Sequence, residues 1–170
     1  MTSAGESETW LKLRTTRVIE LFLETLARSH KWNRIYLISP WISPLDIPGV
    51  MSFDALLKRL RDDSPSLYIV TRPPDQPWHK LAIEQLAATK VANIKLLSTL
   101  HTKLYYADTA QGMFAMLGSA NLTKQSLSNR EIGVLIRGSG PGIKIVRDLS
   151  YEASEIYRSD GSKPHSIKQL

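Results

Sequence analysis

The stretch from His101 to Glu131 contains the residues of this chain that are best suited to chemistry on a phosphate ester. It opens with a His-x-Lys element and continues through Gly-Ser-Ala-Asn at 118–121 to a final Asn-Arg-Glu. Side chains two residues apart lie on the same side of an extended strand, so His101 and Lys103 are predicted to point the same way. A nucleophilic imidazole would then lie beside a fixed positive charge, which suits an anionic centre such as a phosphodiester.

Each polar residue of this stretch can be given a role in phosphodiester transfer. A neutral imidazole is nucleophilic, and attack of His101 on phosphorus would form a covalent phosphohistidine. Lys103 would neutralise the phosphoryl oxygens as charge builds in the transition state. Ser119 and Asn121 can bind the same oxygens or orient the imidazole, and Glu131 can hold the second ring nitrogen, as a carboxylate does in hydrolase triads.

Taken one at a time, these signals are weak. A lone histidine on a strand is usually an ordinary core or surface residue, and a Gly-Ser-Ala-Asn sequence is also typical of a turn. Their succession within one short stretch, with strand-like runs between them, is what favours a catalytic site.

The stretch resembles the HKD signature of the phospholipase D superfamily. The resemblance rests on His101, Lys103, Asp108, Gly118, Ser119, Asn121 and the downstream Glu131. It implies an α/β fold and phosphodiester transfer through a phosphohistidine, without a metal or another cofactor.

The resemblance also implies individual roles for these residues. His101 becomes the nucleophile or its partner acid, Lys103 and Asn121 become phosphate ligands, and Ser119 and Glu131 become supports of the histidine. Asp108 is expected to be structural. Nine residues separate it from Gly118, a few more than is commonest in the family, and a longer hairpin tip at Gln111-Gly112 would accommodate them.

In-line transfer needs a nucleophile on one side of phosphorus and an acid on the other, and members of the family use two HKD elements. This chain has one. Its other histidines, His30, His79 and His165, are predicted to be ordinary surface residues. The second His-Lys set should therefore come from another copy, which predicts a homodimer with the site at its two-fold axis.

Composition narrows the class of protein. The chain has 170 residues, 42% of them hydrophobic, which is enough for one domain with a real core and excludes wholesale disorder. It has no cysteine, no clustered metal-ligand motif, no apolar run near the ~20 residues of a membrane span and no secretory signal. We therefore expect no metal, no stable membrane association and a cytoplasmic location. The net charge of +6 favours a polyanionic partner such as nucleic acid or anionic lipid.

The apolar pattern predicts the elements that hold the stretch in place. Helical spacing predicts helices over 15–29, 53–62, 77–88 and from about residue 141, and apolar runs predict strands at 35–38, 67–70, 93–98, 102–107, 112–118 and 131–137. The Leu-Ile-Ser-Pro-Trp-Ile-Ser segment at 37–43 is expected to be a loop beside the site. Together they predict one α/β domain over 1–170, a mixed β-sheet flanked by helices on both faces, with loose ends at 1–12 and 159–170.

Further residues are candidates for substrate contact. Trp41 is predicted to lie at the rim of the site, whereas Trp32 and Trp78 are predicted to be packing residues. Arg72, Lys124 and Arg130 are candidates for the nucleic-acid backbone beyond the scissile phosphate, although each is equally well explained as a solvated charge.

The function that these observations favour is a metal-independent endonuclease acting on nucleic acid, DNA ahead of RNA. Two alternatives stay open: a phospholipase or phosphatidyl-transfer enzyme with the same chemistry, and a nucleic-acid-binding subunit with little catalysis.

Overall fold

The computed structural model describes residues 10–159, 161 and 163–164 of the chain. These residues form one eight-stranded sheet with the strand order β1-β7-β6-β5-β2-β3-β4-β8. The strands are β1 (Leu11–Thr16), β2 (Trp32–Ile38), β3 (Ser66–Thr71), β4 (Ala92–Leu96), β5 (Leu104–Thr109), β6 (Gly112–Gly118), β7 (Arg130–Arg137) and β8 (Lys163–Pro164). The helices are α1 (Val18–Arg28), α2 (Phe53–Asp63), α3 (Pro77–Ala87) and α4 (Gly142–Arg158), with a 3-10 turn, η1 (Lys124–Leu127).

The sheet is mixed. β2, β3 and β4 are parallel neighbours joined through α2 and α3, while every other pairing is antiparallel. β5 and β6 form the predicted hairpin, which turns at Ala110 and Gln111, one residue earlier than the predicted Gln111-Gly112 pair. Gly112 is the first residue of β6 and has a positive φ of 111° that favours glycine.

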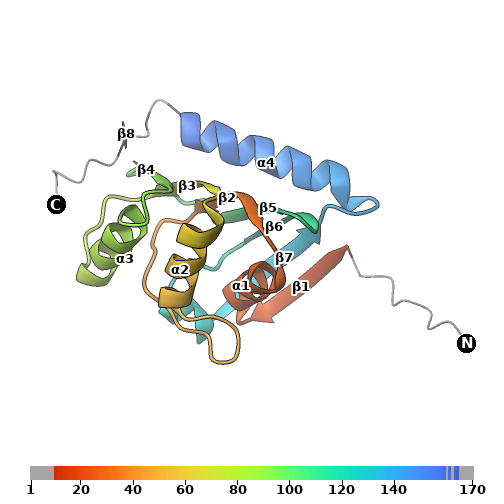
Figure 1. The fold of residues 1–170 in the computed structure, drawn as a ribbon, viewed down its shortest axis with the longest axis horizontal. Helices are drawn as coiled ribbons and strands as arrows, with labels where there is room; N and C mark the ends of the chain where they lie inside the picture. The colour runs from red at the N-terminus through yellow and green to blue at the C-terminus, as the bar shows by residue number, and fades with distance from the viewer. Residues whose placement is uncertain (1–9, 160, 162, 165–170) are drawn as a thin grey trace, which may run out of the picture.

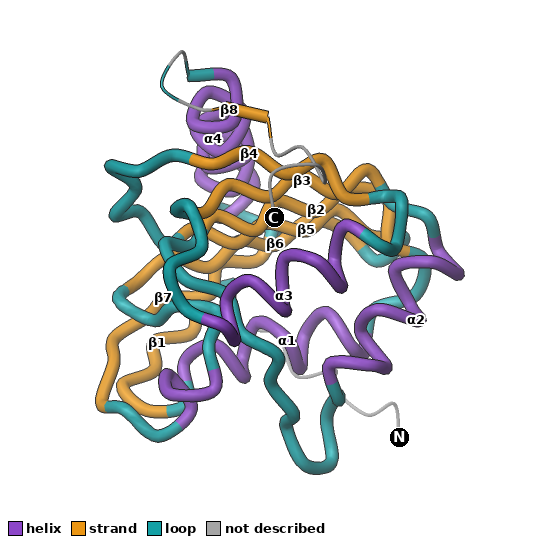
Figure 2. Tube along the Cα trace, turned by 90° about the vertical axis from the view of Figure 1, so that its left-hand side faces the viewer, coloured by secondary structure: helices purple, strands orange, loops and turns teal. Residues whose placement is uncertain are grey.

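Helices cover both faces of the sheet, as predicted. α1, α2 and α3 lie on one face and α4 lies on the other (Figures 1 and 2). The larger core lies under α1–α3 and includes Phe22, Trp32 and Tyr105, while a smaller core joins Val146 and Ala153 of α4 to Tyr106 of β5. Strands buried on both faces have few polar positions, which is why the central strands appear in the sequence as continuous apolar runs.

The N-terminal part of the chain differs from the prediction. Residues 1–9 lie outside the described part, but Leu11–Thr16 forms the edge strand β1 where a loose end and the start of a helix were expected. The helix begins only at Val18, after Arg17, whose φ of 49° interrupts the regular backbone. β1 has no buried residue, so its apolar side chains carry no core signal in the sequence.

Two residues near the C-terminus form a short strand where a loose end was expected. Of the end expected to be loose, residues 163–164 pair with β4 as β8, and residues 160, 162 and 165–170 lie outside the described part. Within the described residues, no helix is both long and apolar enough to span a bilayer.

Candidate active site

The candidate site lies where the parallel strands end. β2 runs into the loop that carries Trp41, β3 runs into Arg72, and the segment after β4 leads to His101. Since the carboxyl ends of parallel strands meet at one edge of a sheet, three segments that are distant in sequence converge there.

His101 and Lys103 lie together, but not as a strand would place them. β5 begins at Leu104, so both residues precede the strand, and the prediction of a strand from residue 102 was wrong there. Lys103 Nζ donates a hydrogen bond to the backbone carbonyl of His101 at 2.8 Å. His101 is exposed, and Lys103 is half-buried.

The imidazole of His101 is bound by Arg72. A guanidinium nitrogen of Arg72 lies 2.8 Å from His101 Nε2, and Arg72 Nε donates to the carbonyl of Leu100 at 2.8 Å. Arginine has only donors, so this contact is a hydrogen bond in the tautomer that carries its proton on Nδ1 and accepts at Nε2. The structure thus places Arg72 next to the proposed nucleophile, whereas the sequence suggested a contact farther along the nucleic-acid backbone.

Ser119 and Glu131 form a pair with each other. The Ser119 hydroxyl donates to the Glu131 carboxylate, and the amide of Ile132 donates to Ser119 Oγ at 3.0 Å. Among the hydrogen bonds of the described residues, none joins either side chain to the His101 ring. Their predicted role as direct supports of the histidine therefore remains a prediction.

Gly118 allows β6 and β7 to approach closely just before Ser119. Gly118 pairs with Gly133, and a Cβ on Gly118 would lie 2.2 Å from the carbonyl oxygen of Ile132 and 2.7 Å from Gly133 Cα. Those are backbone atoms that cannot turn aside, so the position excludes any side chain. The close pairing also brings Ser119 N within 2.8 Å of Ile132 O.

The 37–43 segment is tied to the second half of the signature, as expected of a loop beside the site. Ser39 Oγ accepts a hydrogen bond from Leu122 N at 3.0 Å, and Ser43 Oγ accepts one from Lys124 N at 2.8 Å. The fully buried Tyr105 donates to the Ala120 carbonyl at 2.8 Å, and burial raises the pKa of this phenol, so it stays a donor. These bonds hold the backbone around Asn121.

An open cavity of about 1290 Å³ adjoins this backbone. Trp41, Asn121 and Lys124 line it together with Trp78, and Arg72 lies 4.9 Å from the centre of the Trp41 ring. Trp41 thus connects the cavity to Arg72 and, through it, to His101. Asn121 Oδ1 is buried and has no hydrogen-bond partner among the described residues.

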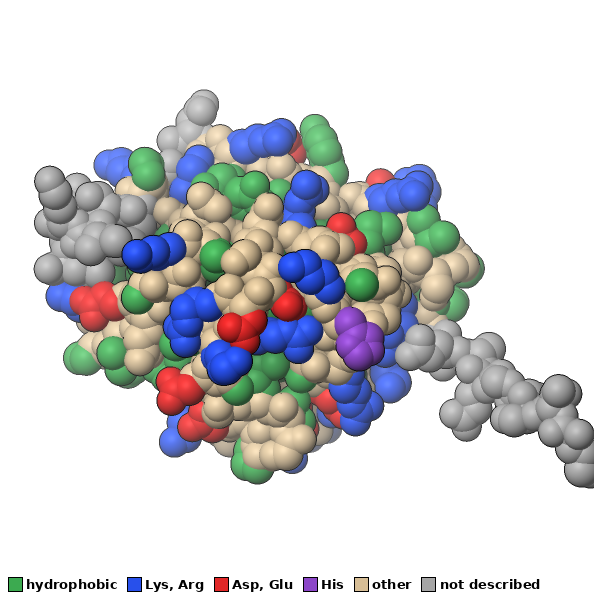
Figure 3. All heavy atoms as spheres, in the orientation of Figure 1, with side chains coloured by type: hydrophobic (Ala, Val, Ile, Leu, Met, Phe, Trp, Pro, Cys, Tyr) green, Lys and Arg blue, Asp and Glu red, His purple; other side chains and the backbone are tan. Residues whose placement is uncertain are grey.

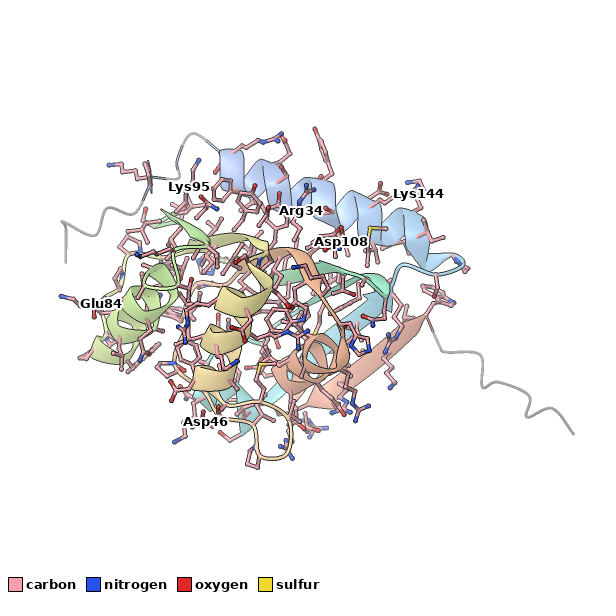
Figure 4. All side chains as sticks on the ribbon, viewed as in Figure 1. Arg34, Asp46, Glu84, Lys95, Asp108 and Lys144 are labelled. Atoms are coloured by element: carbon pink, nitrogen blue, oxygen red, sulfur yellow. The ribbon has the colours of Figure 1, made fainter. Side chains whose placement is uncertain are left out.

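Two predicted residues lie elsewhere. Asp108 is opposite Arg34 in the β2–β5 register, and Figure 4 shows the two close together on the α4 side of the sheet, with Asp46 of the cavity lining on the other side. The structural role implied for Asp108 remains a prediction. Arg130 is exposed at the start of β7, opposite Thr16, and does not line the cavity.

The prediction that His79 is a surface residue was wrong. It is fully buried, its Nε2 lies 2.9 Å from Thr71 Oγ1, and the Thr71 hydroxyl donates to the Pro40 carbonyl at 3.1 Å. Burial lowers the pKa of His79 to about 4, while the charge of Asp75 acts in the opposite direction. His79 therefore stays neutral at neutral pH and supports the Pro40 turn, whose carbonyl also accepts from Arg72 N at 3.2 Å.

The predictions for the remaining histidine and tryptophan residues are confirmed only in part. His30 is exposed, as predicted, whereas His165 lies outside the described residues. Trp32 is fully buried, as predicted, and its Nε1 donates to Leu26 O at 3.0 Å. Trp78 is 40% exposed and lines the cavity, so it is more than a packing residue.

The charge of the chain is dispersed on the face drawn in Figure 3, where basic and acidic side chains lie side by side. Ion pairs such as Arg59–Asp63 and Lys58–Asp62 on α2 contribute to this mixture. In the described part of the chain, no three histidine, aspartate or glutamate side chains gather as metal ligands.

Comparison with known proteins identifies the family to which the chain belongs. The profile described as "Cardiolipin synthase, PLD-like domain" matches residues 27–156. Among curated proteins, none matches the sequence significantly.

Solved structures share the fold at low sequence identity. Nuc from Salmonella typhimurium, a phospholipase D family member, has a TM-score of 0.66 and 15% identity, over 91% of this chain and 98% of its own. NucT from Helicobacter pylori has a TM-score of 0.61 and 11% identity, over 91% of this chain and 98% of its own. TrmBL2, an archaeal chromatin protein that binds DNA, has a TM-score of 0.61 and 14% identity, over 92% of this chain and 55% of its own. With a family match over most of its length and the same fold as Nuc, this chain belongs to the phospholipase D superfamily.

Proposed function

We propose that this protein is a phosphodiesterase that cleaves nucleic acid internally, without a metal ion, through a phosphohistidine on His101. The observation that carries the proposal is the contact between Arg72 and His101 Nε2. Because the guanidinium can only donate, it selects the tautomer in which Nε2 keeps its lone pair, the form that can attack phosphorus.

The reaction divides into two balanced steps. In the first, the Nε2 lone pair of His101 forms a bond to phosphorus, the bond from phosphorus to the leaving oxygen breaks, and that oxygen takes a proton from an imidazolium. In the second, the now neutral imidazole takes a proton from water, the water oxygen bonds to phosphorus, and the phosphorus–nitrogen bond breaks to restore His101. The Nε2 lone pair is free to attack once the Arg72 guanidinium moves from Nε2 to the phosphoryl oxygens. Lys103, Asn121 and Arg72 would then bind these oxygens in both steps.

We infer that the imidazolium comes from a second subunit, because the other two histidines of the described residues are not available: His79 is buried, and His30 lies on the exposed segment between α1 and β2. A two-fold homodimer supplies His101 of the other copy on the opposite side of phosphorus. The described surface offers a face for this contact. Leu13, Val134 and Leu117 are register partners on the α4 side of the sheet, and Leu13 and Leu117 are exposed.

This apolar face adjoins the site. Ile132, two residues before Val134 and therefore on the same side of β7, is 55% exposed and bonds to Ser119 through both backbone groups. Figure 1 shows α4 over the sheet and β1 at the edge of the sheet. Burying exposed apolar side chains beside an incomplete site is what a second copy would achieve.

Nucleic acid is favoured over lipid as the substrate. The chain carries a net charge of +6, and the cavity beside the signature is lined by tryptophan, amide and basic side chains rather than by a continuous aliphatic wall. TrmBL2, which has the same fold, binds DNA.

One assay tests the function. Purified protein is incubated in EDTA with labelled single- and double-stranded DNA, RNA and phosphatidylcholine vesicles, beside the variants His101→Ala and His30→Ala. His30 is an exposed histidine remote in sequence from the site, so its variant is a matched control. Nucleic-acid cleavage that His101→Ala abolishes and His30→Ala retains supports the proposal. Release of choline alone, or binding of nucleic acid without turnover, would refute it in favour of the lipid enzyme or the binding subunit.

A further inference from the structure

The cavity beside the signature has walls that differ from those of a simple phosphate site. Two tryptophans line it, Trp41 from the loop after β2 and Trp78 from the first turn of α3. Trp78 is 40% exposed although it is large and apolar. The half-buried Trp41 has the Arg72 guanidinium over its ring, at 4.9 Å from the ring centre.

The polar groups of the lining fit a nucleotide. Lys124 and Arg17 provide two cations, of which Arg17 is paired with Glu20, and Asp46 is occupied by the amide of Phe53 at 2.9 Å. Asn129 adds an exposed amide from the segment after η1. Aromatic faces bind any base by stacking, amides bind base edges, and cations bind the backbone.

The side-chain carbonyl of Asn121 favours a base over a second phosphate as the ligand of the cavity. Its Oδ1 is buried and accepts no hydrogen bond from the described residues. A buried acceptor needs a donor. An ionised phosphodiester has none, whereas bases carry N–H groups. Asn121 can therefore bind phosphate through its amide nitrogen and a base through its oxygen.

From these observations we infer that the cavity is a base-binding subsite, which holds one unpaired nucleobase of the nucleotide next to the scissile phosphate between Trp41 and Trp78. The inference rests on the proposed function and deepens it, because it names single-stranded nucleic acid as the substrate. The base enters from the solvent side of Trp78, and the path from Trp41 through Arg72 to His101 Nε2 places its phosphate at the nucleophile. A base inside a duplex is stacked on its neighbours and cannot enter.

Binding tests this subsite without requiring turnover. The His101→Ala protein is titrated with fluorescent oligothymidylate and with an abasic oligomer of equal length and charge, and anisotropy gives the two Kd values. Stacking on an aromatic side chain contributes enough to expect a loss of about fivefold or more in oligothymidylate affinity on Trp78→Leu. The abasic oligomer should bind weakly and should be insensitive to this substitution. Tyr151→Leu, which removes an aromatic ring 62% exposed on α4, is the matched control and should change neither Kd.

Cleavage by the protein with His101 intact separates the two proposals. Trp78→Leu should raise KM for oligothymidylate by a similar factor and leave kcat within about twofold, while a duplex of the same length is a poor substrate for both. Base-dependent binding without any cleavage would support the subsite and overturn the nuclease. Cleavage that is equally fast on abasic and base-bearing oligomers, or unaffected by Trp78→Leu, would overturn the subsite and leave the nuclease standing.

Discussion

His79 should make the stability of this protein depend on pH in a way that one substitution removes. Its pKa is about 4 in the folded protein, because of burial, against about 6.5 for an exposed histidine. Between these values the unfolded chain binds a proton that the folded protein does not, so the free energy of unfolding falls as the pH falls. The stabilisation that comes from burying neutral His79 is complete above about pH 6.5 and is lost progressively down to about pH 4.

The size of the effect follows from the same two values. Linkage gives a loss of about 2 kcal/mol between pH 7 and pH 5 from this one group. Replacing His79 with glutamine keeps a neutral side chain that can donate to Thr71 at every pH. Other groups titrate equally in both proteins. The difference between the two slopes of unfolding free energy against pH therefore isolates the contribution of His79.

Urea denaturation at pH 7, 6 and 5 measures this difference. The wild-type protein should lose about 2 kcal/mol more than His79→Gln over this range, even if the variant is less stable at pH 7. Parallel pH profiles for the two proteins would show that His79 titrates normally, and would refute its assignment as a buried neutral support of the Thr71–Pro40 turn.

Two further predictions concern the site and its surroundings. Gly118→Ala should lower the free energy of unfolding by about 1–3 kcal/mol and reduce cleavage, since its Cβ would meet backbone atoms of Ile132 and Gly133; an alanine variant with unchanged Tm and turnover would contradict this geometry. Ile132→Asp should dissociate the homodimer in sedimentation experiments and abolish cleavage, whereas Leu81→Asp, at a position 46% exposed on α3, should do neither. A dimer that survives Ile132→Asp would place the interface elsewhere.

The central strands and the order of the signature could be predicted from the sequence because local patterns encode them. Apolar runs predict buried strands, and the spacing of His101, Lys103, Ser119 and Asn121 is a property of one continuous segment. β1 escaped prediction because an exposed edge strand depends on its partner, β7, rather than on a buried face of its own.

The contacts that join distant segments could not be predicted in detail. Arg72 is 29 positions from His101 in sequence, and only the convergence of β3 and the segment after β4 brings them together. The order of the parallel strands could have suggested this, since each of these residues follows a predicted strand. His79 and Trp78 are neighbours in sequence whose rings lie 5.9 Å apart and nearly parallel, yet one is buried against Thr71 and the other is partly exposed in the cavity wall. Helical periodicity alone does not separate these two environments.

Detection of a covalent intermediate tests the central claim most directly. The protein is mixed with a single-stranded oligonucleotide in EDTA, denatured during turnover, digested and examined by mass spectrometry. We expect a phosphate-linked nucleotide on His101, present also in His30→Ala and missing in His101→Ala. Turnover with no adduct, an adduct on another residue, or cleavage that requires added magnesium would contradict the account.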